Sequence, residues 1–196
     1  QHLKFMHDYG FDVSGLDNSQ AMLDQALIRC SSAKLLCCDL AEFQNKAEFD
    51  LITCFLYSMH YSHPVSSFIQ TLRRAHDALA SGGIFIFDMV DKFGIRNISD
   101  LIDKVDNEDG ELSFNSRWYY RGEGDVLDLF LDIQRKTKSG VQDWNDHHIM
   151  TALEIKQVKN WMTEIGFQVT LLERDFQTIR EWGGESANVI VIGQKH

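Results

Sequence analysis

The chain lacks several features that would assign it to common protein classes. No apolar run among its 196 residues approaches the roughly 20 residues that a membrane-spanning helix needs, so no membrane association is expected. The four cysteines include no CxxC pair, so we expect free, mostly buried thiols in a reducing cytosol. Basic residues are also few, 19 against 29 acidic ones, and the net charge of -10 disfavours a nucleic-acid substrate.

Short apolar stretches alternate with amphipathic segments over about the first 90 residues, which predicts a parallel sheet with helices on both faces. The apolar fraction of 44% is ordinary for a folded domain with a real core. We expect a helix that stops at Gly10, a helix over 21–30, and a helix that starts near Pro64 and is closed by Gly82 and Gly83. The expected strands are 11–16, 34–38, 50–56 and 84–87.

The second half has a different pattern. Residues 112–120, 125–136 and 140–150 are longer and partly alternating, which is typical of antiparallel strands with one solvated face. The acidic stretch 103–111 is the best candidate for a linker. Thr151 to Glu154 reads as a capping box that opens a helix ending at Gly166, and strands over 167–173 and 188–194 follow.

Acidic residues end two of the early strands. Asp17 follows the first strand and Asp39 the second, and Ser19 is placed to begin the next helix. A carboxylate at the carboxyl end of a parallel strand can accept hydrogen bonds from both hydroxyls of a ribose. The pattern therefore favours a protein that binds a nucleoside-containing cofactor.

Five segments in register resemble the class I S-adenosylmethionine-dependent methyltransferases. They are VSGLDNSQAML, LLCCDLAEF, FDLITCFLYSMHY, LRRAHDALASGGIFIFDM, and EIGFQVTLLE followed by ANVIVIGQK. The resemblance covers almost the whole chain, and its nearest subgroup is the small-molecule N-methyltransferases that act on nucleotide-linked aminosugars or on glycine. It implies methyl transfer from S-adenosylmethionine to a small-molecule acceptor, an amine in that subgroup.

The fold implied by the resemblance is a Rossmann-like α/β sheet, mostly parallel with an antiparallel last strand, and an inserted antiparallel β roof. The expected division is a cofactor-binding core over 1–110, the roof over 111–150, and a helix and hairpin over 151–196 that complete the core. The family's first strand and its glycine-rich loop have no counterpart here. We therefore expect the natural chain to carry on the order of 35–45 further N-terminal residues, consistent with a usual domain size.

The resemblance also assigns roles to individual residues. Asp17 would bind the ribose and Asp39 the adenine amine, and the expected cofactor-binding set is Asp17, Asn18, Met22, Asp39, Leu40, Phe55 and Leu56. The purely structural alternatives are a helix cap for Asp17, core packing for Met22 and a solvated turn for Asp39.

Tyr57 follows the third strand, where an acceptor would enter, and His147 or His148 in the roof would receive a proton, which makes Tyr57, His147 and His148 the candidate catalytic residues. Adjacent residues of a strand point to opposite faces, so only one of the two histidines can reach the site. His60 is a weaker candidate for a substrate contact. Trp118, Tyr119 and Tyr120 are more easily explained by packing of the roof onto the core, and no convergent set of metal ligands is visible.

Three other functions stay open. The acceptor atom can be a hydroxyl oxygen, the cofactor can be a nicotinamide nucleotide in an oxidoreductase, or the chain can be a non-catalytic protein of the same fold. The reversed final hairpin argues against the oxidoreductase. An exposed roof sheet can also mediate a homodimer.

Overall fold

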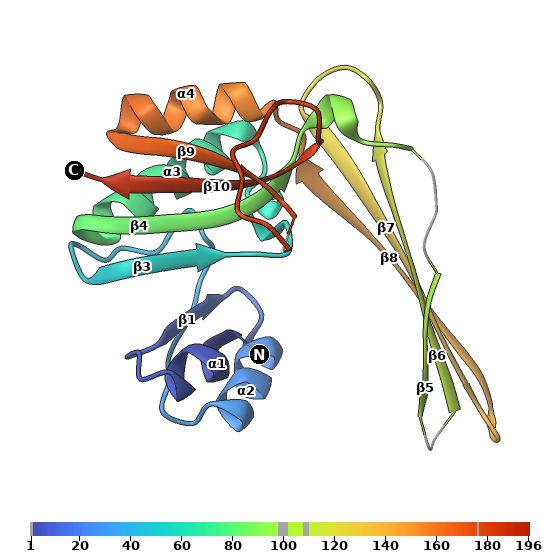
Figure 1. Ribbon diagram of the computed structural model, residues 1–196. Helices are drawn as coiled ribbons and strands as arrows, with labels where there is room; N and C mark the ends of the chain where they lie inside the picture. Colours follow the sequence, from blue (N-terminus) through green and yellow to red (C-terminus); the bar gives the residue numbers. More distant parts are fainter. Residues whose placement is uncertain (1, 98–101, 108–109, 176) are drawn as a thin grey trace.

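The structure, a computed structural model, describes residues 2–97, 102–107, 110–175 and 177–196. Figure 1 shows an α/β core, a small α/β unit beside it that contains the N-terminus, and a long antiparallel sheet that projects away from both. The expected class of fold is recovered, and the paragraphs below give the elements that differ from expectation.

The N-terminal unit consists of α1 (His2–Asp8), β1 (Ser14–Asp17), α2 (Gln20–Arg29) and β2 (Lys34–Cys37). β1 and β2 are parallel neighbours, and a small core of Val13, Cys30 and Ala33 holds α2 against them. The first strand was expected over 11–16, but its ladder begins only where Ser14 pairs with Lys34.

The main sheet is made of β3 (Phe49–Cys54), β4 (Leu79–Val90), β9 (Phe167–Glu173) and β10 (Asn188–Lys195). The strand order is β3-β4-β10-β9, with β3 parallel to β4 and β10 antiparallel to both of its neighbours. The predicted reversal of the last strand is therefore confirmed.

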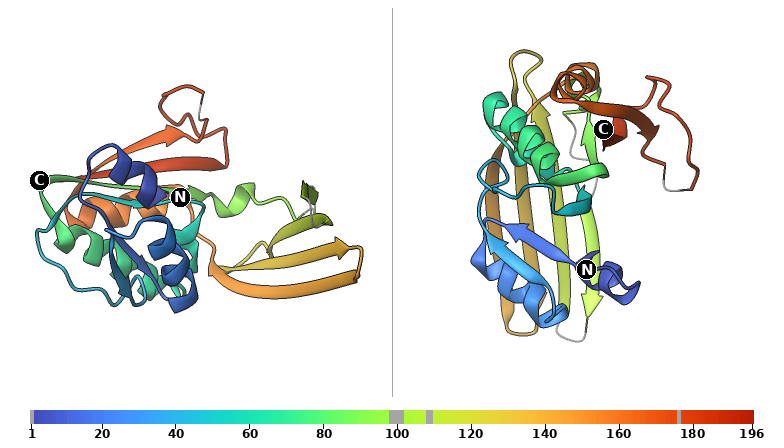
Figure 2. Two further views of the ribbon diagram at one scale, coloured as in Figure 1. Left: turned by 90° about the horizontal axis from the view of Figure 1, so that it is seen from below. Right: turned by 90° about the vertical axis from the view of Figure 1, so that its left-hand side faces the viewer.

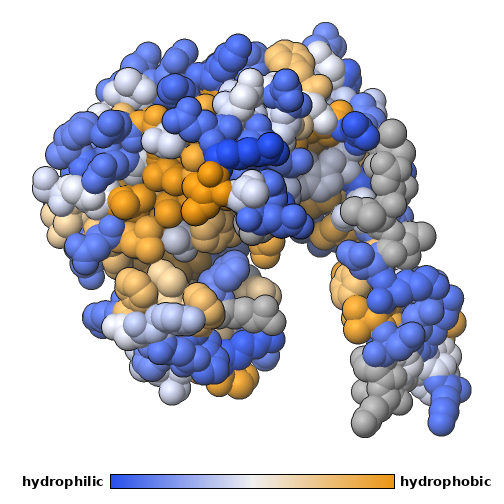
Figure 3. All heavy atoms as spheres, in the orientation of Figure 1, coloured by the Kyte–Doolittle hydropathy of each residue, from blue (hydrophilic) through white to orange (hydrophobic). Residues whose placement is uncertain are grey.

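Two helices, α3 (Val65–Ala78) and α4 (Ile155–Ile165), pack on the same face of this sheet. Successive residues of β4 alternate between that covered face, which takes Phe85 and Phe87, and an opposite face with half-buried Ile84 and Ile86. Figure 3 shows an apolar patch over the main sheet on the side turned to the viewer. Helices on both faces were expected, but α1 and α2 pack on the two-stranded sheet instead.

Helix α3 begins beside Pro64 as expected but ends earlier than expected. The short helix η1 (Ser58–Tyr61) precedes Pro64, which is the N-cap residue of α3. At its other end α3 stops at Ala78, because Leu79 has extended backbone dihedral angles and begins β4. Gly82, with φ of 78°, therefore bends the start of a strand and does not end a helix.

The projecting sheet is a meander of β5 (Ile102–Asn107), β6 (Gly110–Tyr120), β7 (Val126–Thr137) and β8 (Gly140–Thr151). The left view of Figure 2 shows it extending away from the core, and in the right view its long strands lie behind the core. The expectation of a linker over 103–111 was wrong, because residues from this stretch pair in the β5–β6 ladder. The three-part division of the chain stays a prediction.

The capping box expected at the start of α4 does not form. Thr151 is the buried last residue of β8, and its hydroxyl donates to the Ser62 carbonyl at 2.8 Å. The cap comes from Asp91, which lies just before the short helix η2 (Lys92–Gly94). The Asp91 carboxylate accepts the Ile155 N–H at 3.0 Å. Gly166, with φ of 117°, ends α4 as expected.

Within the described ranges, no ladder joins β1 to β3, which belong to separate sheets. The strand expected between them lies outside the 196 residues, so its existence stays a prediction. No helix in the described part of the chain is long and apolar enough to cross a membrane. The cysteines are free as expected, but only Cys30 is buried, since Cys38 and Cys54 are partly buried and Cys37 is exposed.

Candidate functional site

The carboxyl ends of β1 and β2 lie side by side. The Cys38 N–H donates to the Asp17 carbonyl at 3.2 Å, and the Cys37 thiol lies 3.8 Å from the Asn18 carbonyl. Asp17 also receives the Ser19 N–H at 2.8 Å, and Asp39 receives the Ala41 N–H at 2.8 Å. In both carboxylates the other oxygen has no hydrogen bond to any described residue. Two acidic side chains at neighbouring strand ends thus each keep one oxygen for a ligand.

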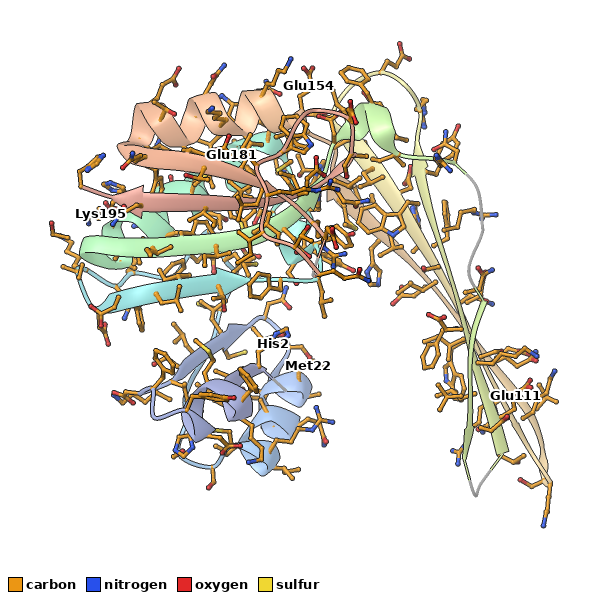
Figure 4. All side chains as sticks on the ribbon, in the orientation of Figure 1. His2, Met22, Glu111, Glu154, Glu181 and Lys195 are labelled. Carbon is orange, nitrogen blue, oxygen red and sulfur yellow. The ribbon has the colours of Figure 1, made fainter. Side chains whose placement is uncertain are left out.

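Met22 lies in the first turn of α2, directly after this edge. Its side chain is 60% exposed, so it does not serve the core packing that Leu23 provides. Ser19, not Asp17, is the N-cap residue of α2 and accepts the Met22 N–H. In Figure 4, Met22 and His2 are drawn near each other on the side of the N-terminal unit toward β3 and the projecting sheet. The two purely structural roles, a helix cap for Asp17 and core packing for Met22, therefore lose support.

The tip of β3 adopts an unusual backbone conformation. Leu56 and Tyr57 both have φ of 59°, the left-handed region that non-glycine residues rarely adopt. The Leu56 side chain is 69% exposed, and the neighbouring Phe55 ring makes an edge contact with His2 of α1 at 5.8 Å. Consecutive strained residues at a strand end commonly mark a functional site, because the surrounding structure must hold them in place.

Tyr57 is held by contacts on every side. Its N–H donates to the Asp88 carboxylate at 2.8 Å, and its hydroxyl donates to the Asn188 side-chain oxygen at 2.9 Å. The guanidinium of Arg174 lies over its ring, 4.6 Å from the centroid. Burial raises the pKa of the Tyr57 phenol, so the group stays protonated near neutral pH. These contacts suit a rigid wall of the site better than a base.

Asp88 and Arg174 were not singled out as site residues from the sequence. Asp88 is 1% exposed, and its second carboxylate oxygen accepts the Arg174 Nε–H at 2.7 Å. The only available signal was position, since Asp88 was expected to end a strand and Arg174 follows the expected strand 167–173. Their pairing across the sheet depends on the order of β4, β10 and β9.

His60 is a structural residue and not a substrate contact. It is fully buried in η1, with Nδ1 at 2.7 Å from the Thr151 carbonyl and Nε2 accepting the Val90 N–H at 3.1 Å. Because a carbonyl only accepts, the proton of the neutral ring lies on Nδ1. His60 therefore ties η1 to β4 and to the end of β8.

The roof strand β6 turns its aromatic residues to alternate faces. Trp118 makes edge contacts with Tyr57 at 5.1 Å and with His60 at 5.9 Å, while Tyr120 is buried among Leu127 and other apolar residues. Tyr119, on the other face, is 39% exposed. Trp118 therefore packs the roof onto the core as predicted, whereas Tyr120 packs mainly within the roof and Tyr119 faces away.

His148 and His147 lie on opposite faces of β8, as predicted. His148 Nδ1 is 2.7 Å from the Tyr61 hydroxyl of η1, and His148 Nε2 is 2.9 Å from Asp146. His147 instead stacks on Phe130 at 4.6 Å and contacts Asp128 at 2.7 Å. Only His148 thus reaches the loop that follows β3, and the sequence analysis missed Tyr61 as its partner.

Two other features lie elsewhere. The described residues hold no group of three or more side chains suited to binding a metal. An open hollow of about 480 Å³ lies against the β9–β10 loop and is lined by Glu173, Arg180 and Glu181 among others. Figure 3 shows an open gap in the molecular outline between the N-terminal unit and the projecting sheet.

Comparison with known proteins agrees with this geometry. Residues 1–83 match a family model described as a methyltransferase domain. A protein of Geobacillus sp. (strain WCH70), provisionally named a methyltransferase, is 27% identical over 173 residues, which are 85% of this chain and 69% of the relative.

Solved structures share the fold. An S-adenosylmethionine-dependent methyltransferase from Clostridium acetobutylicum aligns with a TM-score of 0.77 at 17% identity, over 94% of this chain and 75% of that one. The sugar N-methyltransferase KedS8 from Streptoalloteichus aligns with a TM-score of 0.77 at 17% identity, over 93% of this chain and 70% of that one.

These findings confirm the expected class I methyltransferase fold. The family model over residues 1–83 and the Geobacillus relative agree with the expected enzyme class, a methyltransferase.

Proposed function

We propose that this protein transfers a methyl group from S-adenosylmethionine to the nitrogen of a small-molecule amine. The observation that carries the proposal is the placement of Asp17 and Asp39 at adjoining strand ends, each with one unengaged carboxylate oxygen. Such an arrangement suits an adenosine group, whose ribose diol and exocyclic amine are all donors. The chemistry of the donor set therefore fits the cofactor of the enzyme class.

The residues that would hold the cofactor follow from their positions. Asp17 and Asn18 would bind the ribose, Asp39 and the Leu40 backbone the adenine, and exposed Met22 would pack against the adenosine. Phe55 and Leu56, at the tip of β3, would lie toward the methionine part. The cofactor supplies an electrophilic methyl group on a sulfonium, a good leaving group that needs little acid assistance.

The task left to this chain is to align the acceptor and exclude water. Well-oriented reactants can lower a barrier by on the order of 7–11 kcal/mol, so rigid positioning is sufficient without a catalytic triad. Tyr57 and Trp118 form an aromatic wall that Asp88, Arg174 and Asn188 make rigid. Aromatic faces also favour a nearby cation through their quadrupole.

An amine is favoured over a hydroxyl acceptor by the groups that can receive a proton. Near the tip of β3, the Asp88 carboxylate is engaged by Tyr57 and Arg174, whereas His148 is partly exposed and bonded only to side chains. A histidine within reach of the acceptor can take up the proton that an amine nitrogen releases when it is methylated. The likeness to a sugar N-methyltransferase supports the same choice, with an amino sugar as a candidate acceptor class.

The test uses matched acceptors that differ in one group. Glucosamine is compared with glucose, and glycine with glycolate, with S-adenosylmethionine as donor and adenosylhomocysteine and methylated product measured by mass spectrometry. We expect methylation of an amine at least tenfold faster than of its hydroxyl counterpart. Methylation of the hydroxyl compounds alone would show an O-methyltransferase. Thermal stabilisation by NAD but not by adenosylhomocysteine would contradict the cofactor.

A further inference from the structure

Three side chains from two elements form a continuous hydrogen-bonded chain beside the candidate site. The Tyr61 hydroxyl of η1 lies 2.7 Å from His148 Nδ1, and His148 Nε2 lies 2.9 Å from the Asp146 carboxylate, both on β8. The Tyr61 and His148 rings also make an edge contact at 5.4 Å. The chain therefore connects the loop after β3 with the roof, and its outer end reaches solvent, since the Asp146 side chain is 70% exposed.

Charge decides which atom donates in each bond. Hydrogen bonding from His148 lowers the pKa of Asp146, so the carboxylate is ionised and can only accept. The proton of neutral His148 must therefore lie on Nε2, which leaves Nδ1 as an acceptor for the Tyr61 O–H. Burial raises the pKa of Tyr61, so the phenol keeps its proton and donates it. Both hydrogen bonds, Tyr61 to His148 and His148 to Asp146, are thus donated in the direction from Tyr61 toward Asp146.

The surroundings of His148 differ from those of the structural residue His60, which argues that His148 has a functional role. Both ring nitrogens of His60 are bonded to backbone atoms, and the ring is fully buried. His148 is bonded only to side chains, and it is partly exposed, as is Tyr61 at 45%. When the Tyr61 hydroxyl donates to His148, the lone pairs of its oxygen are left to accept a hydrogen bond from a ligand.

Among the described residues, few other charged groups surround the hydrogen-bonded series Tyr61, His148 and Asp146. The charged groups that act on it are Asp146 itself and His147, which follows Asp146 on β8. The neighbouring strand β7 contributes Leu129 opposite His148 and Leu131 opposite Asp146, which are apolar. A positive charge on His148 is therefore stabilised by one adjacent carboxylate.

We propose that Tyr61, His148 and Asp146 are a proton relay that accepts the proton released by the acceptor amine. The inference rests on the proposed function and assigns Tyr61 as the catalytic residue that contacts the nitrogen, with His148 and Asp146 acting through it. The nitrogen lone pair forms the new N–C bond while the donor's C–S bond breaks, which leaves a proton on nitrogen. That N–H proton passes to the Tyr61 oxygen as the Tyr61 proton passes to His148 Nδ1, and the resulting imidazolium pairs with Asp146.

The first test needs no acceptor and no turnover. Two-dimensional ¹⁵N–¹H NMR of histidine side chains reports the tautomer of each ring, and His148→Gln identifies the His148 signals. We expect the Nε2–H tautomer for neutral His148 in the wild-type protein, and a partial reversal in Asp146→Asn, whose amide can donate to Nε2. A neutral Nδ1–H tautomer in the wild-type protein would overturn the proposal.

The second test uses kinetics with glucosamine or glycine, whichever the wild-type protein methylates. Tyr61→Phe keeps the ring but removes the relay hydroxyl, so kcat should fall at least tenfold, with KM changed less than about threefold. His148→Gln should lower kcat and change its dependence on pH, because it removes the group that accepts the proton from Tyr61. Tyr9→Phe, at an exposed tyrosine in the turn that follows α1, serves as the matched control and should keep wild-type kinetics.

The outcomes separate the two proposals. If no amine is methylated but the His148 tautomer is as expected, the proposed amine acceptor is wrong and so is the relay's assigned role. If an amine is methylated and Tyr61→Phe keeps the wild-type kcat and pH profile, the relay is overturned while the proposed function stands. A purely structural role would instead lower thermal stability in Tyr61→Phe without changing the pH profile.

Discussion

Arg174 donates its Nε–H to Asp88 at 2.7 Å, reaching from the end of β9 across β10 to β4. The Arg174 side chain is 18% exposed and that of Asp88 only 1%, so the pair is largely removed from water. The second Asp88 oxygen holds the Tyr57 N–H, which makes this ion pair the anchor of the strained tip of β3.

Neutralising this anchor should destabilise the fold. Asp88→Asn keeps an oxygen for the Tyr57 N–H but leaves Arg174 without its carboxylate, so we expect a loss of about 3 kcal/mol in the free energy of unfolding. Urea denaturation measures it. The double variant Asp88→Asn/Arg174→Met should recover part of the loss, because it removes the uncompensated charge. Equal stabilities of wild type and single variant would show that the pair contributes nothing.

His60 should make the stability depend on pH on the acid side of neutrality. Burial lowers its pKa from 6.5, so the unfolded chain binds a proton that the folded chain refuses. Stability is therefore highest above pH 6.5 and falls as the pH drops below that value. His76, whose pKa burial also lowers, adds to the same slope.

The variant His60→Gln separates the two contributions. At pH 7.5 it should lose about 2 kcal/mol, because the Val90 N–H and the Thr151 carbonyl lose their partner. Between pH 6.5 and 5 its stability should fall less steeply than that of the wild type. An unchanged slope would mean that His60 does not titrate in this range.

Asp17 should contribute to cofactor binding. Asp17→Ala removes the proposed acceptor of the ribose hydroxyls, and we expect affinity to fall at least tenfold, about 1.4 kcal/mol. Isothermal titration calorimetry with adenosylhomocysteine on the natural full-length protein measures the change. Since Ser19 caps α2, the variant should keep the helix, which circular dichroism can verify. Unchanged affinity would refute the ribose assignment.

Leu56 offers a direct measure of the strain at the tip of β3. Its left-handed φ of 59° is unfavourable for a side chain with a Cβ, and the side chain is exposed. We therefore expect Leu56→Gly to stabilise the fold by about 1 kcal/mol. The matched control Leu36→Gly, in the interior of β2 and also exposed, should destabilise it by about 0.5–1 kcal/mol. Destabilisation in both variants would show that Leu56 is not strained.

The cysteines should differ widely in reactivity. Burial raises the pKa of Cys54 to about 12, so the nucleophilic thiolate is scarce at neutral pH, whereas Cys37 is exposed. Brief treatment with iodoacetamide followed by peptide mass spectrometry should find Cys37 modified and Cys54 intact. Denaturation in guanidinium should make both react. Early modification of Cys54 in the folded protein would contradict its burial.

Much of the architecture could be predicted because hydrophobic periodicity is a local property. The helix α4, the strands of the roof and the reversed pairing of β10 were expected close to their observed bounds. The errors occurred where a distant partner overrides a local signal. Asp91 takes the capping role expected of Thr151, and pairing with β6 turns the acidic stretch after residue 102 into a strand.

The candidate site divides in the same way. Asp17 and Asp39 could be found from the sequence, because Asp17 ends β1 and Asp39 follows β2, and each strand is specified by its own segment. The pairs Asp88–Arg174 and Tyr61–His148 could not, since their members lie 86 and 87 positions apart along the chain. The sequence also left open which of two adjacent histidines turns inward.

By itself, then, the sequence determined the kind of elements, their order and the acidic strand ends, because these depend on residue type and spacing over one helix or strand. Only the tertiary structure decided which side chains meet. The pairing of β7 with β8 turns His148 toward η1 and His147 away from it, and the order of the main sheet brings Arg174 over Tyr57. Strand register and order result from the packing of the whole molecule, which no single segment encodes.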